Sequence, residues 1–181
     1  ATTKEELIRE LTGEGIQVKE HPLLASALLI SGYDYLAAIP AFREGKFQVQ
    51  DAASIMVAEQ AGIKEGDYIL DVCAAPGGKS THLAAKLGGK GLLVANDASA
   101  SRAKALLKNL TVWGCTNSVI TGETPEKLLE AFGCFFDKIL VDAPCSGEGM
   151  FRKDLANARV WSLEKVEECA KTQHAIIRSA D

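Results

Sequence analysis

Two short stretches of this sequence combine small residues with side chains that can do chemistry. The first, from Cys73 to Ser80, is Cys-Ala-Ala-Pro-Gly-Gly-Lys-Ser, and the second, from Asp142 to Lys153, begins Asp-Ala-Pro-Cys. Small residues let the backbone of a turn approach a ligand closely. A cysteine thiolate is a nucleophile, and a carboxylate can hold a protonated ring through a hydrogen bond. The two stretches therefore predict a ligand-binding turn and a group of residues suited to covalent catalysis.

The residues around the first stretch predict the elements that position it. Residues 68–72 form a short apolar run rich in β-forming residues, which indicates a buried strand of a parallel sheet. The Gly-rich stretch cannot continue that strand, and residues 81–87 predict a helix that ends at Gly88 and Gly89. A strand, a Gly-rich turn and a helix open a doubly wound α/β sheet, whose ligand binds at the carboxyl ends of the strands.

Two common Gly-rich motifs fit the first stretch poorly. A phosphate-binding P-loop needs a glycine where Cys73 stands. A dinucleotide-binding motif needs Gly-x-Gly-x-x-Gly, whereas Gly77 and Gly78 are adjacent and follow a proline. The second mismatch argues against a nicotinamide-dependent oxidoreductase on the same fold.

The chain after the Gly-rich stretch alternates strands with helices. We expect further strands and helices, in alternation, at 91–95, 101–112, 118–121, 125–132, 135–141 and 163–180. This alternation predicts a mostly parallel sheet with helices on both faces, whose second strand ends at Asp97. A carboxylate in that position usually binds the two hydroxyls of a ribose. The alternative for Asp97 is to cap the helix that follows.

The first 47 residues carry no motif that indicates a function. Their pattern predicts a helix, a second helix and a strand, at residues 4–11, 22–30 and 36–39. We therefore divide the chain into an N-terminal extension, residues 1–47, and a core, residues 48–181. Asp51 is expected to cap the first helix of the core, which runs to Ala61.

Composition excludes several classes of protein. The chain has 181 residues, of which 47% are hydrophobic and 24% are charged, as in an ordinary globular domain. No apolar run is long enough to span a membrane and the N-terminal residues do not resemble a signal peptide, so we expect a cytoplasmic protein without a membrane partner. The net charge of −4 is not that of a nucleic-acid binder, so a nucleic-acid partner must meet a local basic patch.

The chain has five cysteines, and their spacing matches no zinc site. We therefore expect no metal. Cys115, Cys134 and Cys169 are expected to be buried, reduced thiols, because free cysteine is among the most buried residue types.

The two stretches, with Asp71 before the first, closely resemble one family, the RNA cytosine-C5 methyltransferases that depend on S-adenosylmethionine (SAM). The resemblance is greatest to the bacterial branch that modifies small-subunit ribosomal RNA, the RsmF group, and runs from about Gly45 to the C-terminus. It implies a class I, Rossmann-like methyltransferase fold, SAM as cofactor and RNA as substrate. A methyltransferase for amino groups is less similar, because it has Asn/Asp-Pro-Pro-aromatic where this sequence has Asp142-Ala-Pro-Cys145.

The resemblance also implies roles for particular residues. The cofactor-binding residues are Cys73, Ala74, Ala75, Pro76, Gly77, Gly78, Lys79, Asp97, Glu123 and Asp142. Asp142 contacts the cytosine, Cys145 helps to release the product, and the side chains that contact RNA are Lys79, Arg152 and Lys153. Simpler alternatives are a solvent-facing Lys79, a solvated loop acid at Glu123, and a charged surface loop at Arg152 and Lys153.

The expected reaction needs a nucleophile that this sequence lacks. Carbon 5 of cytosine attacks a methyl group only after a thiolate has added to carbon 6. In the family, that thiol lies in a Ser-Thr-Cys-Thr stretch that this chain does not contain, and Cys169 has no such context. In DNA enzymes of similar chemistry the Pro-Cys thiol attacks, which leaves Cys145 as an alternative. We therefore expect a catalytic-core fragment without its C-terminal strands, and the alternative is a non-catalytic SAM- or RNA-binding module.

Overall fold

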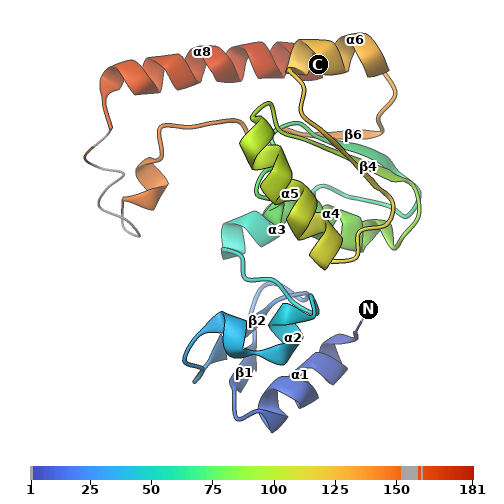
Figure 1. Ribbon diagram of the computed structural model, residues 1–181, viewed down its shortest axis with the longest axis vertical. Helices are drawn as coiled ribbons and strands as arrows, with labels where there is room; N and C mark the ends of the chain where they lie inside the picture. Colours follow the sequence, from blue (N-terminus) through green and yellow to red (C-terminus); the bar gives the residue numbers. More distant parts are fainter. Residues whose placement is uncertain (1, 152–158, 160) are drawn as a thin grey trace.

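The computed structural model describes residues 2–151, 159 and 161–181, and its centre is a four-stranded parallel sheet (Figure 1). The strands lie in the order β5-β4-β3-β6. Their bounds are Ser118–Thr121 for β5, Leu92–Asn96 for β4, Tyr68–Asp71 for β3 and Lys138–Leu140 for β6. Asp71, at the end of β3, is level with Ala95 of β4 and Leu140 of β6, so the strands end together at one edge of the sheet.

Helices cover both faces of this sheet because neighbouring residues of β3 point in opposite directions. Ile69 packs in a cluster with three helices on one face: α3 (Ala52–Gln60), α4 (Gly78–Leu87) and α5 (Ala100–Val112). Leu70 packs on the other face with α6 (Pro125–Phe132) and α8 (Leu163–Ala180), which lie together above the sheet in Figure 1. The expectation of a doubly wound α/β fold is confirmed.

The N-terminal residues build a separate small unit with its own apolar core. In chain order its elements are α1 (Lys4–Gly13), β1 (Gln17–Glu20), β2 (Leu28–Ser31), η1 (Leu36–Ala38) and α2 (Pro40–Arg43). Its buried residues are Leu7, Leu11, Ile16, Ile39 and Ala41. This cluster is distinct from the two clusters that flank the sheet. The division of the chain at residue 47 stays a prediction.

Two predicted elements of this unit are wrong. The helix expected at 22–30 is absent, and residues 28–31 instead form β2, which pairs antiparallel with β1. Leu28 and Ile30 pack on the N-terminal core while Leu29 is exposed, which is the alternation of a strand with one covered face. The strand expected at 36–39 is the short 3₁₀ helix η1, which leads into Pro40 at the start of α2.

The structure also bears on the predicted cap at Asp51, on the burial of the cysteines and on membrane-spanning helices. Asp51 stands at the N-cap position of α3, but its side chain does not accept the capping hydrogen bond. All five cysteines are free, but Cys134 is exposed and Cys115 and Cys169 are half-buried, so the expected burial is wrong. In the described part of the chain, no helix combines the length and apolar character that a membrane span requires.

Candidate functional site

The Gly-rich turn leaves β3 at the end of the sheet and enters α4 directly. Gly77 has a φ of 111°, and a Cβ atom added to it would lie 3.1 Å from Cδ1 of Leu106. The turn therefore needs glycine both for its backbone conformation and for its contact with α5. Asn109 of α5 holds the turn from outside, because its Nδ2 donates a hydrogen bond of 2.7 Å to the carbonyl of Pro76.

Asp71 lies directly beneath this turn and is only 1% exposed. Ser80, in the first turn of α4, donates a hydrogen bond from Oγ to Oδ2 of Asp71 at 2.7 Å. Oδ1 of Asp71 is buried and has no hydrogen-bond partner among the described residues. Burial raises the pKa of Asp71 to about 6, because a carboxylate without water is costly to ionise.

Lys79 and Asp142 join the two stretches that the sequence singled out. The ammonium of Lys79 lies 2.6 Å from Oδ2 of Asp142, which comes shortly after β6. The side chain of Lys79 is 21% exposed, so it is not the solvent-facing lysine of the simpler alternative. A lysine at a helix N-terminus opposes the helix dipole, and the carboxylate of Asp142 offsets that unfavourable placement.

Asp97 lies at the end of β4 with its side chain 2% exposed. Its Oδ1 accepts hydrogen bonds from the backbone N–H of Ser99 at 2.9 Å and from Nε of Arg102 at 3.0 Å. Ser99, not Asp97, is the N-cap residue of α5. The carboxylate thus stabilises the start of α5 through these two hydrogen bonds. Its binding of a ribose stays a prediction.

Asn96, which the sequence analysis did not single out, links the ends of three chain segments. Its Nδ2 donates to the carbonyls of Val72 and Glu123, and its Oδ1 accepts from Oγ1 of Thr121 and from the N–H of Glu123. Glu123 is thereby fixed through its backbone next to Asp97. Its carboxylate, however, forms an exposed ion pair of 2.9 Å with Lys127, which matches the solvated acid of the alternative. The predicted contact of Glu123 with adenine is not tested by this geometry.

Cys145 is exposed in the loop that follows Asp142. Gln173 of α8 donates a hydrogen bond of 2.8 Å to the carbonyl of Pro144, and Ser146 donates at 2.7 Å to the carboxylate of Glu148. These contacts fix the loop on both sides of the thiol. Arg152 and Lys153, the expected RNA contacts, lie outside the described residues.

The thiol of Cys73 is unsuited to attack a substrate. Burial, and to a smaller extent the carboxylate of Asp71, raises the pKa of Cys73 to about 11. A cysteine with such a pKa is a neutral thiol near pH 7, and the nucleophile in such chemistry is the thiolate. Cys73 therefore lines the cavity but does not act as a nucleophile.

A cavity of about 240 Å³ lies between the Gly-rich turn, Asp142 and the start of α3. Of the predicted site residues it brings together Cys73, Ala74, Ala75, Pro76, Gly78, Lys79 and Asp142. Asp71 and Gln50 also line it, and the sequence analysis assigned a role to neither. Asp97 and Glu123 lie apart from it, at the ends of β4 and β5. In the described residues no cluster of His, Cys, Asp or Glu is arranged to hold a metal.

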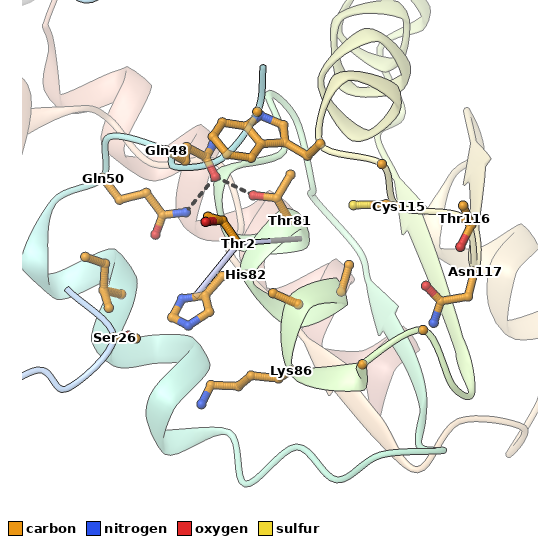
Figure 2. Close-up of a pocket in the computed structure, with 18 of the residues that line it drawn as sticks. Thr2, Ser26, Gln48, Gln50, Thr81, His82, Lys86, Cys115, Thr116 and Asn117 are labelled. Carbon is orange, nitrogen blue, oxygen red and sulfur yellow. Dashed lines mark hydrogen bonds between the residues drawn. The ribbon is translucent and has the colours of Figure 1, made fainter. Parts of the chain in front are cut away.

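A larger cavity, of about 670 Å³, lies elsewhere, between the N-terminal unit and α4 (Figure 2). Its lining includes Gln48, Thr81, His82, Lys86 and Trp113, but none of the predicted site residues. By volume alone, this larger cavity would be the candidate functional site. The smaller cavity is the better candidate for chemistry because it lies at the carboxyl ends of the strands, where ligands of such sheets bind.

The residues at this edge fit a cofactor with the chemistry of SAM. The turn has no side chain at Gly77 and Gly78, where a Cβ on Gly77 would meet α5, and a carboxylate stands at the end of β4. A parallel sheet with helices on both faces and this turn after its central strand defines the class I fold of SAM-dependent methyltransferases.

Comparison with known proteins gives the family. The model of the family described as 16S rRNA methyltransferase RsmB/F matches residues 59–181, and the chain belongs to this family. Ribosomal RNA small subunit methyltransferase F of Pectobacterium atrosepticum is 45% identical over 139 residues, which are 75% of this chain and 28% of that protein. The chain thus spans somewhat less than a third of the length of the curated relatives it matches.

Two solved structures are similar to this fold. The protein titled PH0851 has a TM-score of 0.91 and 32% identity, over 99% of this chain and 41% of that one. NSun6 from Pyrococcus horikoshii, solved with SFG, has a TM-score of 0.71 and 35% identity, over 82% of this chain and 38% of that one.

Proposed function

We propose that this chain is part of the catalytic core of an enzyme that transfers a methyl group from SAM to carbon 5 of cytosine in RNA. The observation that carries the proposal is the ion pair of Lys79 and Asp142, which holds the Gly-rich turn against the Asp-Ala-Pro-Cys stretch. The name of the relative from Pectobacterium atrosepticum supports small-subunit ribosomal RNA as the substrate. The same proposal places the protein in the cytoplasm.

In this proposal, different residues of the chain bind the cofactor and the cytosine. The turn at Gly77 and Gly78 leaves room for the cofactor, Asp97 binds its ribose and Glu123 accepts from its adenine amino group. SAM supplies an electrophilic methyl group next to the turn. Asp142 holds the cytosine ring through a hydrogen bond, which stabilises the ring in its protonated form.

The covalent step needs a thiolate at carbon 6 of the base. Cys145 is exposed beside Asp142 and is assigned to release of the product. The attacking thiol of the family belongs to a stretch that is absent from this sequence. The second candidate is a module that binds SAM or RNA without turnover.

Calorimetric titration of SAM into the 181-residue chain tests the proposal. We expect saturable binding that Asp97→Ala weakens by about tenfold or more, because the ribose hydroxyls lose a charged acceptor. Arg102→Ala is the matched control, since it breaks the same ion pair but keeps the carboxylate, and it should leave binding nearly unchanged.

The two outcomes lead to different conclusions. If a folded chain shows no heat of binding, or if Arg102→Ala weakens binding as much as Asp97→Ala does, the assignment of Asp97 to the ribose is wrong. If the chain binds SAM, transfer of a labelled methyl group to RNA separates the enzyme from the binding module.

A further inference from the structure

The cavity under the ion pair contains two acceptor atoms that lack donors. Oδ1 of Asp71 and Oε1 of Gln50 are both buried, and neither has a hydrogen-bond partner among the described residues. The other polar atoms of these side chains are used: Oδ2 of Asp71 accepts from Ser80, and Nε2 of Gln50 donates to the carbonyl of Gly78. Buried polar atoms in proteins are nearly always paired, so this cavity is suited to receive a hydrogen-bond donor.

Lys79 lines the same cavity and has donors to spare. A lysine ammonium carries three N–H donors, and within the described residues that of Lys79 makes one hydrogen bond, to Asp142. The residues that carry these donors and the two buried acceptors therefore line one cavity. Lysine suits such a place, because its ammonium is a compact charge on a stem with four rotatable bonds.

The proposed function gives this arrangement a purpose, and the inference rests on that function. Asp142 must accept a hydrogen bond from the cytosine, and in this structure the ammonium of Lys79 occupies one of its two carboxylate oxygens, Oδ2. We propose that Asp71 is the second acceptor for the ammonium of Lys79, which moves from Asp142 to Asp71 when a base engages Asp142. Asp71 is then a positioning residue that frees Asp142 for the substrate.

The electrostatics of the cavity agree with this exchange. Burial raises the pKa of Asp71 to about 6, and the nearby carboxylate of Asp142 also raises it, so this carboxyl is costly to ionise. An arriving ammonium would offset the cost of ionising Asp71. The other titratable groups that line the cavity are Asp51 and Cys73, and the thiol of Cys73 is neutral near pH 7.

A carbon-detected NMR titration of the Asp71 carboxyl in the 181-residue chain tests the exchange without cofactor or RNA. In Asp142→Asn the ammonium loses its first partner, so we expect it to move to Asp71 and to lower the pKa of Asp71 by about 1–3 units. Loss of the Asp142 charge alone also lowers this pKa. The ammonium of Lys79 already lowers this pKa from its place beside Asp142. We therefore measure the effect of Asp142→Asn in two backgrounds, the native chain and Lys79→Met.

The comparison of these variants decides the inference. The exchange is supported if Asp142→Asn lowers the pKa of Asp71 by about one unit more in the native background than in the Lys79→Met background. An equal fall in both backgrounds shows that Lys79 does not reach Asp71 and that water satisfies the buried oxygen, which overturns the inference. Because no SAM is present, failure here is distinct from failure of the SAM titration.

Discussion

Asp71 is a carboxylic acid held away from water, and its protonation affects folding. Its pKa is about 6 in the folded chain, against an ordinary value of 3.8. Between these two values the folded state binds more protons than the unfolded state, so this residue favours folding at acid pH. That contribution is lost as the pH rises through about 6.

We expect Asp71→Asn to remove this pH dependence. Relative to the native chain, the variant should gain about 2 kcal/mol in free energy of unfolding between pH 4 and pH 7. Urea unfolding at both pH values measures the difference. Asp34→Asn, at an exposed position, should show no such gain, and equal behaviour of the two variants would show that Asp71 titrates normally in the folded chain.

Gly77 gives a second prediction for a single residue. Gly77→Ala adds a Cβ at a φ of 111° and 3.1 Å from Leu106, so we expect the free energy of unfolding to fall by about 1–3 kcal/mol. We also expect weaker binding of SAM, because the turn must shift. Gly13→Ala adds the same methyl group where nothing lies within 4 Å. It should change neither the free energy of unfolding nor the binding of SAM. Thermal unfolding and calorimetry of both variants test this.

At the scale of elements, Glu59 of α3 connects the N-terminal unit to α4. Its carboxylate accepts hydrogen bonds from Ser26 at 2.7 Å and from Lys86 at 3.0 Å, and it lies 3.5 Å from Nε2 of His82. Figure 2 shows Ser26, His82 and Lys86 on the same side of the large cavity. This cluster joins residues far apart in the sequence at one side of that cavity.

Glu59→Gln is expected to loosen this connection. Because three partners lose a charged acceptor in a half-buried place, we expect a loss of about 1 kcal/mol in the free energy of unfolding and faster hydrogen exchange in α1 and β1. Glu65→Gln removes a carboxylate from the exposed pair with Lys90, which should cost less than about 0.5 kcal/mol. The idea fails if hydrogen exchange in the N-terminal unit is the same in both variants.

The sequence predicted the sheet well because its strands and helices have strong local signals. The apolar run of β3, the glycines that end α4 and the Thr-Pro start of α6 each act over a few residues. The N-terminal unit was harder to predict. The run Leu28–Ile30 is apolar throughout, so its two-residue period appears only where the fold covers one side of it.

The sequence also predicted part of the site, namely the residues that lie in contiguous motifs. The Gly-rich turn, Lys79 and Asp142 lie in contiguous motifs, and the structure brings them together. Arg102 and Asn96 lie in no such motif, because their roles depend on partners that are distant in the sequence or across a turn. A polar residue at the end of a buried strand, as at Asn96, was a usable signal, since a buried side chain amide requires partners.

At the scale of the whole molecule, β6 has an outer edge on which no other described strand lies. Tyr68, Phe135 and Ile139, in or near β3 and β6, are about 40% exposed, and the rings of Tyr68 and Phe135 stack at 5.0 Å. An unpaired strand edge next to exposed apolar side chains favours pairing with another chain.

We therefore expect this chain to self-associate as its concentration rises. Sedimentation equilibrium should show a monomer and a larger species in exchange, and Ile139→Lys should shift the balance to monomer. Leu107→Lys places the same charge at an exposed leucine of α5, away from this edge, and should have little effect. A chain that stays monomeric throughout, or that responds equally to both changes, contradicts this role of β6.

The position of β6 also affects how long the site persists. Lys79 and Asp142 are 63 positions apart, and β6 is a strand of three residues that holds Asp142 near the sheet. Short edge elements open more readily than the strands beside them. A brief release of β6 would take Asp142 from the cavity while β3, β4 and the Gly-rich turn stay folded. Local opening at one edge would therefore separate the Gly-rich turn from the carboxylate of Asp142 long before the domain unfolds.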